Sequence, residues 1–212
     1  TDVVSGFSRG ADVADLNNDG FPEIFTTEML PPDNQRLKTM TRFDETNVKE
    51  LKVRADYHIQ VLQNCLHFND GNGNFQELAA LANTEASDWS WGALIFDMDN
   101  DGWKDIFVSN GILRDITSMD FVSFASDREN IKKIVQKEGK LDVNDLLAYL
   151  PTTKISNYAY INQRNRTFIN QADSLGLGIP SFSNGSAYAD LDNDGDLDLV
   201  VNNINAPASI YQ

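Results

Sequence analysis

Short apolar runs occur in pairs along this chain, and each pair encloses a polar stretch of about nine residues. The runs are rich in β-branched and aromatic residues, which favour strands over helices. They are Ala11–Ala14 with Ile24–Thr26, Ala93–Phe96 with Ile106–Val108, and Ala187–Ala189 with Leu199–Val201. The pattern therefore predicts three strand–loop–strand units with no helix beside any of the three loops.

A second pattern of turn residues follows the first two units. The segments Phe68–Leu78 and Ile161–Gln171 both read as hairpins, the first with Asp-Gly and Asn-Gly turn signals. In both segments an Asn is followed six positions later by a Phe. Each repeat then contains a strand, a polar loop, a strand, an insertion, a strand, a turn and a strand. Four antiparallel strands per repeat are typical of a β-propeller blade, so we expect an all-β fold with helical insertions.

The third repeat is shorter than the other two, because Ile210–Gln212 reads as the first strand of a hairpin whose turn lies beyond it. We expect repeat one at about residues 6–79, repeat two at about 87–172 and a truncated repeat three at about 183–212. About two and a half blades do not close a propeller, which usually has four to eight. The sequence therefore predicts part of a longer protein, or a chain that associates with another copy through open strand edges.

Insertions separate the second and third strands of the first two repeats. In the first insertion, 28–57, a short helix is predicted over Asn47–Ala55. In the second, 111–157, we predict a helix that Ser118 caps and Gly139 ends, then a helix over Asp142–Leu150 that stops before Pro151. The apolar residues of the first of these recur at helical spacing: Phe121, Val122, Phe124, Ala125, Ile131, Ile134 and Val135. We expect a helical hairpin on the rim of a sheet, which either covers a blade face or binds a ligand.

The three polar stretches share the pattern D-x-[DN]-x-D-G-x-x-[DE]. Oxygen-bearing side chains at positions 1, 3, 5 and 9, with a Gly at position 6 for the sharp turn, can surround one hard cation. The candidate ligands are Asp15, Asn17, Asp19 and Glu23; Asp97, Asp99, Asp101 and Asp105; and Asp190, Asp192, Asp194 and Asp198. Position 12 is Thr26, Val108 or Val201 instead of the Glu of an EF-hand. The alternative interpretation is a set of surface turns without a metal.

The loops and hairpins together resemble the FG-GAP/VCBS repeats of integrin-alpha-like β-propellers. They are most similar to bacterial extracellular members of that group, which often occur beside ASPIC/UnbV-type domains. The resemblance covers about residues 6–27, 58–79, 87–110, 158–172 and 183–212. Trp91-Gly92 stands where Phe-Gly is expected, and only Ala206-Pro207 matches the Gly-Ala-Pro element. These departures favour the VCBS side of the group.

This resemblance implies up to three Ca²⁺ ions. Each loop would add a backbone carbonyl at position 7 to its side-chain ligands, contributed by Phe21, Trp103 and Asp196. It also implies an extracellular, cell-surface or periplasmic location, where calcium is abundant. We expect a module for binding or adhesion whose partner is a protein or glycan on a cell surface.

Composition agrees with this interpretation. The 212 residues include 17 basic and 32 acidic ones, for a net charge of −15. Eleven carboxylates stand at ligand positions, and three calcium ions would bring the balance to about −9. Such an acidic surface argues against nucleic acid or an anionic membrane as a partner. The sequence has no long apolar run and no signal peptide, so we expect no membrane insertion.

Few residues in the chain favour catalysis. His58 and His67 are the only histidines, and the sequence has no Gly-rich phosphate loop, nucleophile elbow or zinc signature. Cys65, the only cysteine, reads as a buried strand residue. Three tryptophans lie near the second loop and are either core residues or a platform for a sugar ring: Trp89, Trp91 and Trp103. We expect that the chain is not an enzyme. One alternative is that it forms part of a glycan-acting surface enzyme whose active site lies in the insertions or outside this chain. Another is that it is an architectural spacer.

Overall fold

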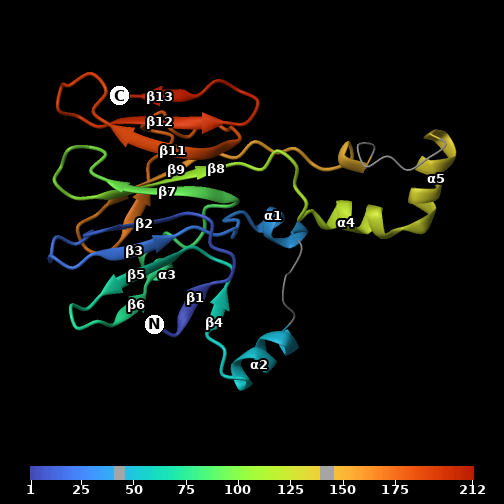
Figure 1. The fold of residues 1–212 in the computed structure, drawn as a ribbon, viewed down its shortest axis with the longest axis horizontal. Helices are drawn as coiled ribbons and strands as arrows, with labels where there is room; N and C mark the ends of the chain where they lie inside the picture. The colour runs from blue at the N-terminus through green and yellow to red at the C-terminus, as the bar shows by residue number, and fades with distance from the viewer. Residues whose placement is uncertain (41–45, 139–145) are drawn as a thin grey trace.

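The structure, a computed structural model, describes residues 1–40, 46–138 and 146–212. Three antiparallel sheets lie side by side (Figure 1). The first contains β2 (Ala11–Ala14), β3 (Glu23–Thr26), β5 (Cys65–Asn69) and β6 (Phe75–Glu77). The second contains β7 (Ser90–Phe96), β8 (Asp105–Asn110), β9 (Tyr158–Asn162) and β10 (Phe168–Asn170). The third contains β11 (Ser183–Ala189), β12 (Asp198–Asn203) and β13 (Ser209–Tyr211).

The strand order within each sheet follows the chain, as the sequence predicted. The first two sheets have four strands and the third has three, and none of them closes into a barrel among the described residues. The Asn and Phe of each predicted hairpin face each other across their strands, as Asn69 with Phe75 and Asn162 with Phe168. The repeat boundaries drawn from the sequence stay predictions, although each unit begins with the expected strand.

The first strands of the three sheets are neighbours, because β7 contacts both β2 and β11. The side chain of Asp12 on β2 accepts a hydrogen bond of 2.7 Å from the backbone N–H of Ile95 on β7. A further pair of short parallel strands, β1 (Val3–Ser5) and β4 (Ile59–Val61), was not predicted. β4 pairs with the N-terminal segment, and the third strand of the first sheet begins later, at Cys65.

Two of the three buried apolar clusters form layers between the sheets. Successive side chains of a strand point to opposite faces, and β8 uses both faces because all six of its residues are buried. Ile106 and Val108 pack toward the first sheet, with Phe25 and Leu66. Phe107 packs toward the third sheet, in a cluster that also contains Leu199 and Val201. This strand, which follows the second acidic loop, is therefore fixed on both sides.

The helices lie in the insertions, with several differences from prediction. α2 (Thr46–Arg54) confirms the helix expected at 47–55, whereas α1 (Asn34–Thr39) and α3 (Ala79–Ala82) were not predicted. Ser118 caps α4 (Met119–Ser126) as expected. The single helix predicted from there to Gly139 was wrong, because the chain is extended at Asp127 before α5 (Arg128–Glu138).

Asp127 interrupts the predicted helix because its side chain caps the N-terminus of α5. Its carboxylate accepts the backbone N–H of Glu129 at 2.8 Å, as an N-cap residue does. The hydrophobic spacing continues through the break, which is why the sequence indicated one helix. Gly139 and the start of the helix predicted at 142–150 lie outside the described residues.

α4 and α5 form an arm that projects away from the sheets (Figure 1). α4 has no buried residue, and its Phe124 stacks on Tyr149 with ring centroids 4.6 Å apart. The arm therefore does not cover a blade face, and ligand binding, the other alternative for this insertion, stays a prediction. None of the helices in the described part of the chain is long and apolar enough to cross a membrane.

The half-buried Arg36 joins the roots of the two insertions. Arg36 on α1 donates to Asp88 at 2.6 Å through Nε and to Asp115 at 2.9 Å through Nη1. Asp88 immediately precedes the Trp89–Ser90 entry to β7, and Asp115 lies at the base of the arm. Both carboxylates are buried, so the ion pairs fix the ends of the sheets that face away from the acidic loops.

Candidate metal centre

Each acidic loop connects the first two strands of a sheet and is wound around its position-1 carboxylate. In the first loop, Asp15 accepts the backbone N–H groups of Asp19 at 3.2 Å and Gly20 at 2.8 Å. In the second loop, Asp97 accepts the N–H groups of Asp101 at 3.0 Å and Gly102 at 2.8 Å. The position-1 aspartate therefore holds the loop conformation without an ion.

The third loop repeats part of this arrangement, since Asp190 accepts the N–H of Gly195 at 3.2 Å. Two positions in every loop adopt the left-handed backbone that non-glycine residues rarely use. They are Asn at position 4 and Gly at position 6: Asn18, Asn100 and Asn193, and Gly20, Gly102 and Gly195. The Gly was predicted from the sequence and the Asn was not, although Asn tolerates this conformation better than most residues.

The position-9 carboxylate is the first residue of the second strand and joins both ends of the loop. It accepts the backbone N–H of the residue at position 2. The three bonds are Leu16 to Glu23 at 2.7 Å, Met98 to Asp105 at 3.0 Å and Leu191 to Asp198 at 2.8 Å. All three carboxylates are buried. The predicted ligand at position 9 thus has a structural role in the loop as well.

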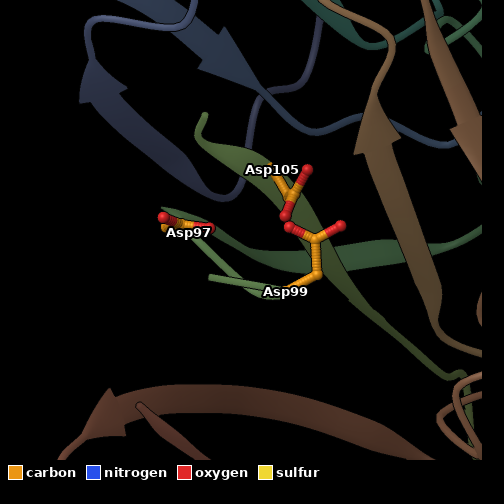
Figure 2. Close-up of side chains that lie close together, drawn as sticks. All are labelled: Asp97, Asp99 and Asp105. Carbon is orange, nitrogen blue, oxygen red and sulfur yellow. The ribbon is translucent and has the colours of Figure 1, made fainter. Parts of the chain in front are cut away.

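In the second loop, three carboxylates converge: Asp97, Asp99 and Asp105 each offer an oxygen within 4.8 Å of the others. Figure 2 shows the side chains of Asp99 and Asp105 directed toward each other, with Asp97 beside them. Burial, together with the nearby charges of Asp99 and Asp101, raises the pKa of Asp105 to about 6. A bound cation would favour the charged form and offset this repulsion.

Asp101, the predicted ligand at position 5 of the second loop, lies outside this group. Its carboxylate is instead paired with Arg164 of the β9–β10 turn, at 2.6 Å. That hydrogen bond lowers the pKa of Asp101. The backbone N–H of Trp103 also donates to the Asp101 carboxylate, at 2.8 Å. The backbone at Trp103 therefore turns around the position-5 side chain.

In the third loop the converging carboxylates are those of positions 1, 3 and 5: Asp190, Asp192 and Asp194. All three are exposed. Loss of solvation and the neighbouring charge of Asp194 raise the pKa of Asp192. Asp198 lies outside this group of three, as the position-9 residue that holds Leu191.

The first loop has Asn17 at position 3, so it presents three carboxylates instead of four. Asn17 donates its amide to Asp19 at 2.9 Å. Oε1 of Glu23 is buried and lacks a hydrogen-bond partner of normal geometry among the described residues, although the nearby backbone N–H of Asn69 lowers the carboxyl pKa. Burial nevertheless has the larger effect and raises the pKa of Glu23. A buried oxygen with spare acceptor capacity at position 9 fits a cation ligand.

The predicted carbonyl ligands at position 7 stay predictions. The structure shows that the backbone N–H of these residues donates to the position-5 carboxylate in all three loops. The bonds are Phe21 to Asp19 at 2.9 Å, Trp103 to Asp101 at 2.8 Å and Asp196 to Asp194 at 3.0 Å. This shared bond gives the three loops the same turn after the Gly.

Comparison with known families supports the repeat assignment. Residues 62–108 match the family model of an FG-GAP-like repeat. The chain contains an FG-GAP-like repeat. The match begins just before β5 and ends within β8, so it spans the last two strands of the first sheet, β7 and the whole second acidic loop. No curated protein matches the chain. The expected association with ASPIC/UnbV-type domains stays a prediction.

The second loop, which lies in the FG-GAP-like repeat, is coupled to the first loop through Asn162 on β9. The backbone N–H of Asn162 donates to Asp105 at 2.8 Å. Its side-chain amide donates to the carbonyls of Leu16 in the first loop, at 2.8 Å, and Lys104 in the second, at 2.9 Å. Asn162 is buried, so the two loops share a fixed hydrogen-bond donor.

Other residues singled out in the sequence lie away from the loops. Trp89 and Trp91 stand at the far end of β7 from Asp97, and the Arg9 guanidinium lies 4.0 and 4.8 Å from their ring centroids. Trp89 is buried and Trp91 is half-buried, which favours packing over a sugar platform. Cys65 is fully buried, as predicted, and burial raises its pKa to about 12.

Proposed function

We propose that this chain is a calcium-binding segment of a β-propeller-like interaction module. The observation that supports this proposal most is the convergence of Asp97, Asp99 and Asp105 in the FG-GAP-like repeat. Like charges so close together are unfavourable unless a cation neutralises them or a proton is taken up. The raised pKa of Asp105 agrees with that cost.

The donor set favours calcium over magnesium or transition metals. All candidate side chains offer oxygen, which excludes the soft ligands that zinc or copper prefer. Calcium accepts six to eight oxygens in irregular arrangements, whereas magnesium requires near-octahedral geometry and retains water. A nine-residue loop with four acidic positions and a backbone carbonyl suits the larger ion.

The ion has a structural role in this proposal. Position 1 follows the first strand and position 9 begins the second, so one ion held by Asp97 and Asp105 would join β7 to β8. Because β8 is buried on both faces, this clamp would stiffen the central sheet. Ligand binding to the folded state alone raises stability, and millimolar calcium outside cells would keep weak sites loaded. We therefore place the protein outside the cytoplasm.

The sheets would then form a rigid, non-catalytic scaffold for a partner. The insertions leave the sheets at the ends opposite the calcium loops, and loops on a rigid scaffold usually carry recognition. We propose that a protein or glycan on a cell surface binds there. The third sheet, with three strands instead of four, leaves β13 as an edge strand among the described residues, which favours association with further strands.

A thermal melt with and without a calcium chelator tests the structural role. We expect calcium to raise the melting temperature by several degrees, as about 1–2 kcal/mol does for a chain of this size. Asp97→Ala should reduce the increase, since it removes a converging ligand. Asp120→Asn removes one exposed acidic group on α4 and is the matched control. An identical melting temperature in chelator and in calcium would contradict the proposal.

A further inference from the structure

The turns that close the first two sheets share one hydrogen-bond pattern. Asn69 accepts the backbone N–H of Gly71 at 3.0 Å, and Asn162 accepts that of Arg164 at 2.9 Å. A backbone bond then closes both turns, from Asp70 to Asn74 at 3.1 Å and from Gln163 to Thr167 at 2.9 Å. Because the backbones correspond, the residues at matching positions are directly comparable.

At two matching positions the first turn has glycine and the second has arginine. Gly71 and Arg164 have φ angles of 73° and 61°, and Gly73 and Arg166 have 86° and 68°. Glycine adopts this left-handed conformation freely, whereas other residues are strained in it. The second turn therefore places arginine in a conformation that its counterpart reserves for glycine, which calls for a compensating interaction.

Only one of these arginines reaches the acidic loop in the contacts that the structure records for this turn. Arg164 Nη2 lies 2.6 Å from Asp101 Oδ2, whereas the Arg166 guanidinium lies 5.5 Å from the ring centroid of Phe68. Asp101 is position 5 of the second loop, and it is the acidic residue of that loop that stays outside the converging group. Arg164 thus holds one predicted calcium ligand.

We propose that Arg164 is a tethered cation that competes with calcium for Asp101 and lowers the affinity of the second loop. This inference rests on the proposed function. The second loop has Asp99 where the first has Asn17, so it carries four carboxylates at ligand positions against three. Lys104 within the second loop already brings its formal charge to −3, the same as in the first loop, and Arg164 brings it to −2. The arginine therefore adds a positive charge beyond that of Lys104, directly on Asp101, and stabilises the loop without its ion.

Trp103 provides a probe for this loop. A terbium ion bound beside a tryptophan emits after indole excitation, and this transfer falls steeply with distance. Position 7 is Phe21 in the first loop and Asp196 in the third, so Trp103 reports the second loop. The other two tryptophans precede or begin β7, at the end far from Asp97. Trp103→Phe should remove most of the emission, and calcium added in competition then gives the calcium affinity of the same loop.

Arg164→Gly is the decisive variant, because Gly71 shows that the same turn accepts glycine. Arg166→Gly is the matched control: it removes the same charge, from the same strained conformation, two residues away. We expect Arg164→Gly to tighten terbium and calcium binding by about fivefold at low salt, as for an exposed ion pair. The difference should shrink as salt rises. Arg166→Gly should change either affinity by less than about twofold.

The outcomes separate this inference from the proposed function. Selective tightening in Arg164→Gly supports the competition. Unchanged or weaker binding in Arg164→Gly, or equal tightening in both variants, overturns the competition while calcium binding stands. Absence of any terbium emission sensitive to Trp103→Phe overturns both. The reciprocal change, Gly71→Arg, is unsuitable because a Cβ there would lie 2.7 Å from the Phe21 ring.

Discussion

The two ends of the sheets are built by opposite means. At one end, three short loops repeat the same carboxylate and backbone hydrogen bonds almost position by position. At the other, the helices of the two insertions do not correspond, and the half-buried Arg36 of the first insertion pairs with Asp115 of the second and with Asp88 beside β7. The end with the three loops is suited to stabilising the sheets. The end with the insertions can differ from one repeat to the next. Substitutions at each end therefore test where stability resides and where recognition is expected.

The largest loss should come from Asp105→Ala. Its carboxylate accepts the half-buried backbone N–H of Met98 and the buried N–H of Asn162, and an alanine leaves both without that partner. In chelator, we expect the free energy of unfolding to fall by about 3 kcal/mol, measured by chemical denaturation. Asp99→Ala, in the same loop, should cost less than about 1 kcal/mol because Asp99 is exposed. Equal losses would show that position 9 has no special role.

A smaller loss is expected at the opposite end from Arg36→Met. This change keeps an apolar stem and leaves the buried Asp88 and Asp115 without their shared cation. We expect a loss of about 2 kcal/mol, since breaking a buried pair strands the remaining charges. Arg54→Met is the control, because its pair with Glu50 is exposed on both sides and is worth little. No loss from Arg36→Met would mean that the insertion root does not stabilise the sheets.

In the absence of metal, the free energy of unfolding should depend on pH through Asp105, at the loop end of the sheets. The pKa of Asp105 is about 6 in the folded chain against 3.8 unfolded, so the folded state binds the proton more tightly. Between pH 4 and 6 this group should make the free energy of unfolding fall as pH rises. Asp105→Asn should remove that component, and saturating calcium should suppress it by favouring the charged form. A slope unchanged by Asp105→Asn would contradict the assignment.

We expect the smallest change in the free energy of unfolding from a substitution in the projecting arm. Phe124→Ala removes the stacking on Tyr149 but opens no cavity between the sheets. We expect a change of less than about 1 kcal/mol in the free energy of unfolding. A loss above about 2 kcal/mol would show that α4 supports the sheets instead of standing apart from them.

The strands and loops were predictable because their signals are local. Alternating apolar residues and Asp-Gly turns specify β2, β3, β7 and β8 within a few residues, and the acidic spacing gave the three groups of candidate ligands. The partner of Asp101 was not predictable, since Arg164 lies 63 residues away and meets it only through the fold. The break at Asp127 was missed because apolar spacing continues across it, while capping by a side chain interrupts the helix.

Calorimetric titration of the whole chain with calcium tests the central claim most directly. The loops predict saturable binding of up to three ions per chain, with one ion fewer after Asp97→Ala and no change after Asp120→Asn. Absence of saturable binding up to millimolar calcium, or the same number of ions in all three proteins, would contradict the account.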